Sequence, residues 1–265
     1  RDTNLSGRVQ ANVLMVRMNV KDFIITGSEK DKQQFQEYWD RTQGFLAEAQ
    51  SDINKKERAD KIDFVDDSLK KYLEGWNHIV EDRKKRDHLV KNVLDVNGPK
   101  MEKGLTSIME SAYADEDEVA SHYAGLALRN LMLARLYMAK FLDSNAQAHV
   151  DRVHSEMESF NSYLSTLDEE IKNPERRKYL ADVRSRYKNY SESFDELAKV
   201  IFERNDVITN TLDRIGPEVA AAIEDVKLSV KEEQDALGPM LQASNGNAIN
   251  MVLIAIGVAL ALGIT

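Results

Sequence analysis

Three arginines stand at positions where helical periodicity places core residues. Arg86 follows Ile79 by seven residues, and Arg204 follows Leu197 by the same interval. Arg83 likewise lies seven residues after a tryptophan. Seven residues return a helix to nearly the same face, so we expect these guanidinium groups to face a core. Because a guanidinium can bind a carboxylate through two parallel hydrogen bonds, we interpret the three as a candidate carboxylate clamp.

An internal salt bridge is the alternative for these arginines, because a buried guanidinium rarely lacks a partner. Asp40 and Glu158 lie at a similar height along the expected helices and could supply the carboxylates. The candidate distal site, formed by the three arginines, also includes Tyr72 and Tyr190.

A second candidate site, called proximal, combines arginine and asparagine near the starts of two expected helices. Its residues are Arg8, Asn12, Arg17, Arg129, Asn130 and Arg135. Three alanines at 220–222 oppose this stretch and leave room for a ligand. Alternatively, Asn12 and Asn130 hydrogen-bond each other to set the register of packed helices, and Arg17 and Arg135 are solvated.

Other chemistry finds little support in the sequence. The chain has no cysteine, which excludes disulfides, zinc–thiolate sites and thiol catalysis. His149 and His154 are five residues apart, so a helix would separate them rather than align them as a metal pair. The acidic run at 115–118 is expected to cap a helix. With no catalytic grouping in a credible cleft, we expect no enzyme, no metal site and no cofactor.

Composition favours long helices and disfavours a nucleic-acid partner. The 265 residues include 36 Lys+Arg and 45 Asp+Glu, for a formal net charge of −9. A nucleic-acid binder would need a basic face to neutralise phosphates. Only 4 Pro and 12 Gly are present, which disfavours folds rich in strands and turns.

The chain repeats itself at an offset of 118 residues. The paired positions include Gly7 with Gly125, Asn12 with Asn130, Arg17 with Arg135, Phe23 with Phe141, Tyr72 with Tyr190, and Gly98-Pro99 with Gly216-Pro217. One register holds over roughly 100 residues without a gap, which indicates a duplicated unit.

Each repeat predicts three helices. They span about 5–26, 30–54 and 60–112 in the first repeat, and about 117–142, 145–172 and 174 onward in the second. Asn173 followed by Pro174 is typical of a helix start, because proline favours the first helical position. Pro99 and Pro217 fall inside the long helices, where proline is expected to produce a kink.

These lengths predict an all-α fold of two stacked four-helix bundles, built from two long and four short helices. At a rise of about 1.5 Å per residue, the two short helices of a repeat together match its long one. The expected membrane-proximal module comprises 1–27, 99–144 and 217–246. The expected membrane-distal module comprises 28–98 and 145–216.

An uncharged run at 248–264, AINMVLIAIGVALALGI, predicts a transmembrane helix over 248–265 that the chain contains only in part. A buried core helix is the alternative. We therefore expect a fragment: an extramembrane domain followed by most of a membrane helix.

This pattern resembles the helical bimodular sensor domain of bacterial methyl-accepting chemotaxis receptors and some sensor histidine kinases. The resemblance covers residues 1–246 and depends on the helix pattern, the repeated Gly-Pro and the terminal apolar segment. It implies a homodimeric periplasmic sensor anchored in the inner membrane, with a cytoplasmic signalling module beyond residue 265. It also implies small carboxylate ligands, such as tricarboxylic-acid-cycle intermediates in the proximal module and acetate in the distal one.

We therefore expect a chemoreceptor sensor domain that recognises a small organic acid, a C4 dicarboxylate or related acid, and signals by helix displacement. The alternatives are a histidine-kinase sensor and a sensor of a periplasmic binding protein with no small ligand of its own. Homodimerisation is further favoured by apolar residues outside the core stripe of the first and fourth helices. These residues are Leu14, Met15, Met18, Ile25, Leu128, Met132, Leu133 and Leu136.

Overall fold

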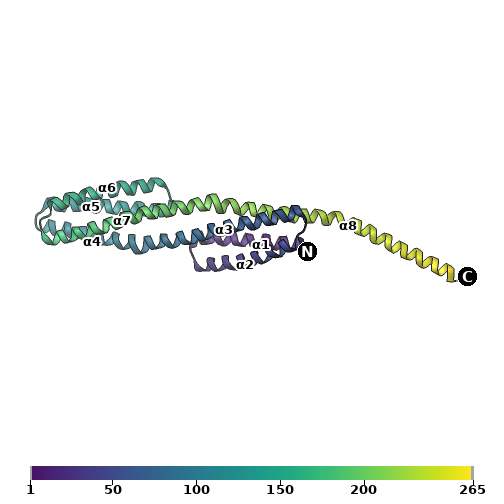
Figure 1. Ribbon diagram of the computed structural model, residues 1–265. Coiled ribbons are helices and arrows are strands. Elements are labelled where there is room, and N and C mark those ends of the chain that lie inside the picture. Colours follow the sequence, from purple (N-terminus) through teal and green to yellow (C-terminus); the bar gives the residue numbers. More distant parts are fainter. Residues whose placement is uncertain (1, 264–265) are drawn as a thin grey trace. The chain divides into compact units, whose positions relative to one another are not determined.

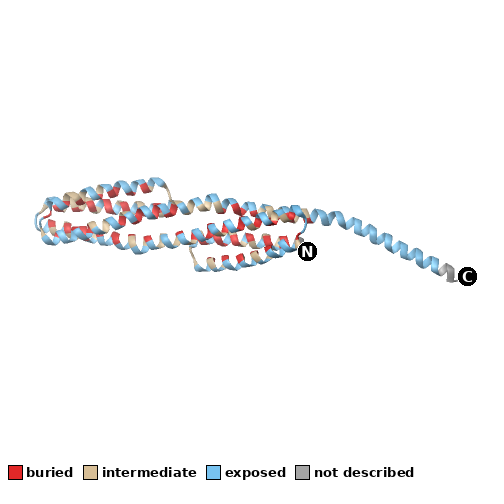
Figure 2. Cartoon of the chain, viewed as in Figure 1, coloured by how far each residue is buried: buried red, intermediate tan, exposed pale blue. Residues whose placement is uncertain are grey.

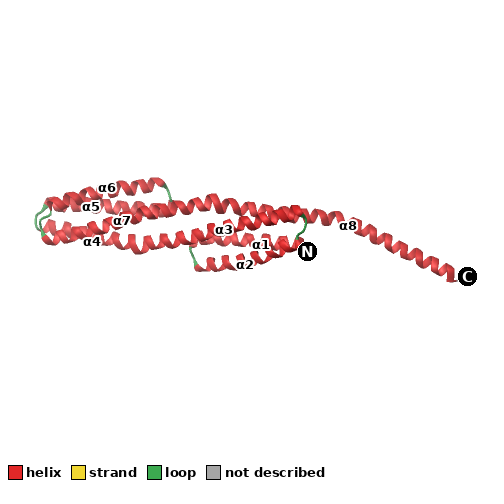
Figure 3. Ribbon diagram, viewed as in Figure 1, coloured by secondary structure: helices red, strands yellow, loops and turns green. Residues whose placement is uncertain are grey.

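The computed structural model describes the backbone of residues 2–263 and the side chains of residues 4–259. The described backbone consists of helices joined by short connections, without a strand (Figure 3), which confirms the all-α class. The helices are α1 (Asp2–Thr26), α2 (Glu29–Asp52), α3 (Lys56–His88), the π-helical η1 (Leu89–Leu94), α4 (Asp95–Ala114), α5 (Glu118–Ser144), α6 (Gln147–Glu170), α7 (Pro174–Val207), the π-helical η2 (Ile208–Leu212) and α8 (Asp213–Gly263).

The chain divides into two compact units. Unit 1 contains the described residues up to Trp76 and from Asn210 onward, and unit 2 contains Asn77–Thr209. Unit 1 thus holds α1, α2, most of α3, the end of η2 and α8 (Figure 1). Unit 2 holds α4, α5, α6 and α7, together with the end of α3 and η1.

Each unit combines three helices of one repeat with a fourth helix of the other. The offset of 118 residues relates α1, α2 and α3 to α5, α6 and α7, and relates α4 to the start of α8. Unit 1 takes α8 from the second repeat, and unit 2 takes α4 from the first. Equivalent residues of the two repeats therefore occupy equivalent places in the two units.

This division differs from the expected modules, which separated α2 from α1 and α6 from α5. In the structure α2 packs on α1, and α6 packs on α5. The physical reason is the turn between them, where Gly27 has a φ of 65° and Asn145 a φ of 54°. A left-handed residue at the end of a helix reverses the chain, so the second helix returns along the first.

The core of each unit consists of the apolar residues that the helical spacing predicts (Figure 2). In unit 1, Phe35 stacks on Trp76 with ring centroids 4.2 Å apart, and the edge of Phe23 meets the same indole at 5.0 Å. In unit 2, Phe160 and Tyr190 are fully buried. Such rings contribute much of the apolar area that stabilises a bundle.

The repeated Gly-Pro follows a π-helical turn in both long helices. Pro99 lies in α4 just after η1, and Pro217 lies in α8 just after η2. Proline has no N–H to donate to the carbonyl four residues earlier, which weakens the helical ladder there. In η1 the ladder widens, since Asp95 N donates to the carbonyl of Val90, five residues back.

Beyond Val230, α8 carries exposed side chains throughout 231–259. The expected transmembrane segment, 248–265, continues past the described residues at its C-terminal end. Within the described part of the chain, no helix is both long and apolar enough to cross a membrane.

Candidate functional site

The expected proximal residues do not form one site, because they belong to different units. Arg8, Asn12 and Arg17 lie on α1 in unit 1. Their counterparts near residue 130 lie on α5 in unit 2: Arg129, Asn130 and Arg135. The structure therefore divides the expected proximal residues between two units, and a single proximal pocket stays a prediction.

In unit 2, Asn130 belongs to a buried polar network between α5 and α6. Its Nδ2 donates to Glu156 Oε2 at 2.8 Å, and Arg152 Nε donates to the other carboxylate oxygen at 2.7 Å. Arg129 Nη2 donates to Asn130 Oδ1 at 3.3 Å. Asn130 and Glu156 are 3% and 5% exposed. A carboxylate of the protein itself thus occupies the polar position between these two helices.

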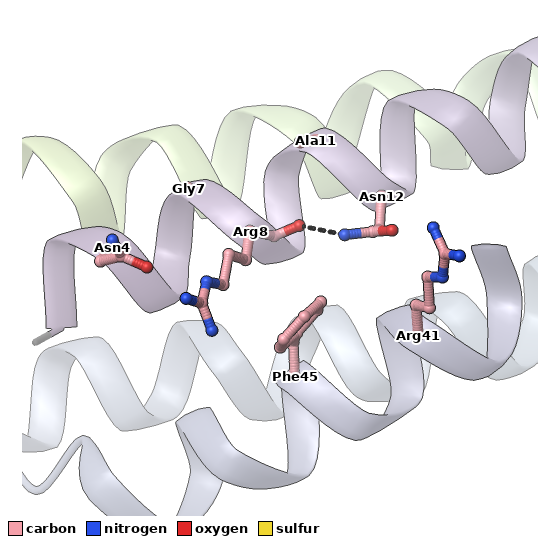
Figure 4. Close-up of a pocket in the computed structure, with 7 residues that line it drawn as sticks. All are labelled: Asn4, Gly7, Arg8, Ala11, Asn12, Arg41 and Phe45. Atoms are coloured by element: carbon pink, nitrogen blue, oxygen red, sulfur yellow. Dashed lines mark hydrogen bonds between the residues drawn. The ribbon is translucent and has the colours of Figure 1, made fainter.

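In unit 1, the equivalent helices enclose an open groove instead. Its volume is about 760 Å³ (Figure 4). The residues that line it are Asn4, Gly7, Arg8, Ala11, Asn12, Arg41 and Phe45. The offset of 118 places Tyr38 where unit 2 has Glu156, so this unit has no acid at that position.

Two guanidinium groups line the groove from α1 and α2. Arg8 Cζ lies 5.5 Å from the centre of the Phe45 ring, and Asn12 Nδ2 donates to the Arg8 carbonyl oxygen at 2.8 Å. Arg41 pairs with Glu37 on its own helix and lies over the Tyr38 ring. Among the described residues, no carboxylate lies within 4.0 Å of the Arg8 guanidinium. The groove therefore presents cationic and amide donors with little internal neutralisation.

Arg17 and Arg135 lie away from these polar positions, each against a glycine. Arg135 Nη1 pairs with Glu102 Oε2 of α4 at 2.7 Å and covers Gly98. Arg17 covers Gly216 at the start of α8. The two arginines are equivalent in the repeat and have equivalent contacts in the structure. Each packs on a Gly-Pro helix and contacts neither Asn12 nor Asn130 through a hydrogen bond that the structure shows.

The expected distal arginines are gathered in unit 2, and the salt-bridge alternative holds for two of them. Arg86 Nη1 and Arg83 Nε lie 2.7 and 3.3 Å from Asp87 Oδ1. Arg204 Nη2 instead donates to Asn145 Oδ1 at 2.8 Å. Burial, together with the charges of Arg86 and Arg83, lowers the pKa of the Arg204 guanidinium. The partner is thus Asp87, not the expected Asp40 or Glu158.

The two tyrosines assigned to the distal site lie elsewhere. Tyr72 is in unit 1 and Tyr190 in unit 2. Burial raises the pKa of each phenol, opposed by the nearby charge of Arg17 for Tyr72 and of Arg135 for Tyr190. Tyr72 thus lies in a different unit from the distal arginines, and Tyr190 packs near Gly98 in unit 2.

The sequence reading missed a pair of buried arginines at the starts of α3 and α7. Arg58, 5% exposed, donates through Nη2 to the Ser229 carbonyl at 2.8 Å and pairs with Glu233 of α8. Its repeat equivalent Arg176, also 5% exposed, pairs with Asp115 at 3.2 Å. The offset of 118 also relates Glu233 to Asp115. The acidic residue at this position of both repeats is the sequence feature that could have predicted the two ion pairs.

The acidic run and the histidines have structural contacts. Asp117 Oδ1 accepts a hydrogen bond from Ala120 N and caps α5, as expected from the sequence. His154 Nε2 lies 2.7 Å from Asp195 Oδ1 on the surface of unit 2. Among the described residues, no group of three or more His, Cys, Asp or Glu side chains is arranged to hold a metal ion.

No protein-family model matches this chain, and no curated protein matches it significantly.

Proposed function

We propose that this chain is the extracytoplasmic sensor domain of a bacterial chemotaxis receptor. In this proposal, the groove of unit 1 binds a small dicarboxylate, and α8 carries the signal toward the inner membrane. The chain would act as a homodimer, with a cytoplasmic signalling module that follows residue 265. The sensor of a histidine kinase is the alternative with the same binding chemistry.

The observation that carries the proposal is the carboxylate of Glu156 in unit 2. There, Asn130 and Arg152 donate to this carboxylate in a buried place between two helices. Unit 1 keeps the asparagine, as Asn12, but has Tyr38 in place of the acid. A carboxylate from solution would supply in unit 1 what the chain supplies to itself in unit 2.

Two cations favour a ligand with two carboxylates. Arg8 and Arg41 both line the groove, from α1 and α2 respectively, and Phe45 lies between them in Figure 4. A guanidinium binds a carboxylate with charge-assisted and often bidentate hydrogen bonds. A four-carbon diacid would place one carboxylate at each arginine and its methylene groups over the ring. Because Glu37 partly neutralises Arg41, Arg8 is expected to contribute more to affinity.

The contacts between α1 and α8 support a mechanical output. Gln10 Nε2 donates to Glu224 Oε2 at 2.6 Å, and Lys227 Nζ donates to Gln10 Oε1 at 3.2 Å. Gln10 lies between Arg8 and Asn12 in the sequence, so a ligand-dependent shift of α1 would act directly on α8. Packed helices move by about 1–2 Å in such switches, and a ligand drives the shift only if it binds one arrangement better.

Succinate binding to the purified chain tests the proposal. We expect Arg8→Gln and Asn12→Ala each to weaken succinate binding about tenfold or more in isothermal titration calorimetry, since each removes a hydrogen bond to the ligand, charge-assisted for Arg8. Arg129→Gln, in unit 2, is the control and should leave the affinity unchanged. Wild-type affinity in both unit 1 variants would exclude the groove as the binding site.

A further inference from the structure

Unit 2 has an open pocket of its own at the end where α4 turns back into α5 (Figure 1). Its volume is about 660 Å³. The residues that line it are Tyr113, Glu118, Val119, Ser121, His122 and Tyr123. This lining combines aromatic rings and an aliphatic side chain with a single acid, so its chemistry is the opposite of the arginine-lined groove in unit 1.

The pocket depends on a reversal of the chain that the second repeat does not make at the equivalent place. Helix α4 ends at Ala114, and α5 begins at Glu118. The offset of 118 relates Tyr113 to Lys231 and Glu118 to Ala236, which both lie inside the continuous helix α8. The end of α4 and the first two turns of α5 therefore come together only in unit 2.

Two tyrosines give the pocket aromatic surface that a ligand can reach. Tyr113, in the last turn of α4, is 81% exposed. Tyr123 is partly buried, and its ring centroid lies 6.0 Å from that of Tyr163 on α6 and 5.3 Å from that of His122. One ring is thus held by its neighbours and the other is free in solvent. The face of such a ring attracts a cation through its quadrupole and also packs well on methyl groups.

The charges around the pocket also favour a cation. Arg176 pairs with Asp115 at 3.2 Å and with Asp117 at 3.3 Å, so one guanidinium serves both acids. Glu116 and Glu118 are exposed. Among the residues whose side chains are described, no basic group lies within 4.0 Å of either glutamate carboxylate. The turn therefore has more negative charge than the chain itself neutralises.

The helix ends at this turn do not cancel that negative charge. The last turn of α4 has no basic residue, so its carbonyl groups add negative partial charge beside Tyr113. The positive end of α5 is offset by Asp117, which caps it, and by Glu118 in its first turn. Glu118 thus also stabilises the start of α5, and the experiment has to separate this structural role from ligand binding.

We propose that this pocket binds a small quaternary ammonium ion of the size of choline. Its methyl groups would pack on Tyr113, Tyr123 and Val119, with its charge beside Glu118. A quaternary ammonium ion has no N–H to donate, so it is recognised by aromatic faces and an anion rather than by a set of hydrogen-bond acceptors. The proposal does not depend on the dicarboxylate groove, because it concerns other residues, the other unit and a ligand of opposite charge.

Choline chloride titrated into the whole chain tests this proposal. Binding is followed by saturation-transfer NMR of the trimethylammonium protons and by the melting temperature, with sodium chloride at equal ionic strength as the reference. Dimethylbutanol, in which carbon replaces the nitrogen, has the same shape without the charge. We expect choline to bind about threefold or more tightly than this alcohol, because only the cation is attracted by the rings and the carboxylate.

Two variants with matched controls locate the site. Tyr113→Leu removes the exposed ring but keeps an apolar side chain, and Glu118→Gln removes the charge at nearly constant size. Each should weaken choline binding about threefold or more. The controls are Tyr179→Leu, at a tyrosine 43% exposed on α7, and Glu110→Gln, at an exposed acid on α4. Neither control residue lines the pocket, so both variants should keep wild-type affinity.

The outcomes also separate this pocket from the groove and from general charge attraction. Tyr113→Leu and Glu118→Gln should keep succinate binding, and Arg8→Gln should keep choline binding. Absence of choline binding to the wild-type chain, equal affinity for dimethylbutanol, or wild-type affinity in both pocket variants would overturn the proposal. An equal loss in Glu110→Gln and Glu118→Gln would also overturn it, since the net charge of −9 alone would then attract the cation. If Glu118→Gln lowers only the melting temperature, Glu118 serves the helix start and the site is wrong.

Discussion

At the scale of single residues, the two units differ mainly in where carboxylates stand. Unit 2 pairs its polar positions with its own acids, Glu156 and Glu102. Unit 1 has Tyr38 and Ala220 at the equivalent places. Among the residues whose side chains the structure describes, no carboxylate pairs with Arg8 or Arg17. The attraction between a cation and an anion is stronger where water is excluded. Arg17 is partly buried, and Arg8 is exposed. This asymmetry between the units is why we assign carboxylate binding to unit 1.

Substitution of Arg58 measures how much a buried arginine contributes to stability when the chain itself supplies its carboxylate partner. Arg58→Gln removes hydrogen bonds to Ser229 and the pair with Glu233, so we expect the free energy of unfolding to fall by about 1–3 kcal/mol. Urea denaturation measures the change. Lys56→Gln is the control, because its pair with Asp60 is exposed and should contribute about 0.5 kcal/mol or less.

The effect of Arg58→Gln should also depend on pH. Hydrogen bonding to Arg58 and its charge lower the pKa of the Glu233 carboxyl. A carboxyl with a lowered pKa in the folded state stabilises the protein above its ordinary pKa and loses that contribution as the pH falls through the lowered value. The stability difference between wild type and variant should therefore shrink in acid. A difference that stays constant or grows would contradict the role given to Glu233.

At the scale of helices, the space around a glycine shows how closely its helix packs on a neighbouring helix. Gly104 in α4 faces Val183 of α7, and a Cβ at residue 104 would lie 2.7 Å from Val183 Cγ2. Gly44 in α2 has nothing within 4 Å of such a Cβ. The same substitution should therefore have opposite effects at the two positions, although both are interior to helices.

We expect Gly104→Ala to destabilise the chain by about 1–3 kcal/mol, because a buried β-branched side chain has to move. Gly44→Ala should stabilise it by about 0.5–1 kcal/mol through helix propensity. Thermal and urea unfolding followed by circular dichroism would measure both changes. If the two variants shift stability in the same direction, the close packing of α4 on α7 is wrong.

At the scale of the whole molecule, the repeat leaves the same apolar pair uncovered in both units. Leu14 and Met18 on α1 are 44% and 55% exposed, and their equivalents Met132 and Leu136 on α5 are 45% and 49% exposed. These side chains point away from their own cores. They support the prediction that a second copy of the chain covers them.

Cysteine crosslinking tests this prediction without interference, because the chain has no cysteine of its own. Met18→Cys in this chain should form a covalent dimer under mild oxidation. Lys188→Cys, at a side chain 80% exposed on α7, should not. Equal crosslinking of both variants, or none at Met18 and at Leu136→Cys, would reject a dimer through these faces.

Local patterns in the sequence are enough to predict the helices, their repeat and most of the core. Phe23, Phe35 and Trp76 lie at helical spacing from other apolar residues of their helices, and the structure buries all three. Asn173 and Pro174 predicted the start of α7, where Asn173 Oδ1 accepts a hydrogen bond from Glu175 N. These features depend on neighbours within a few residues, so periodicity and capping chemistry are sufficient to predict them.

Which helices pack together, and which polar groups come into contact, depends on the three-dimensional fold. The turn at Gly27 could continue or reverse the chain, and its left-handed φ of 65° reverses it. That reversal put α2 beside α1. The pairing of Arg58 with Glu233 joins residues 175 positions apart, which no local pattern specifies. Sequence periodicity says which face of a helix is buried, but the partner on that face depends on how the whole chain folds back on itself.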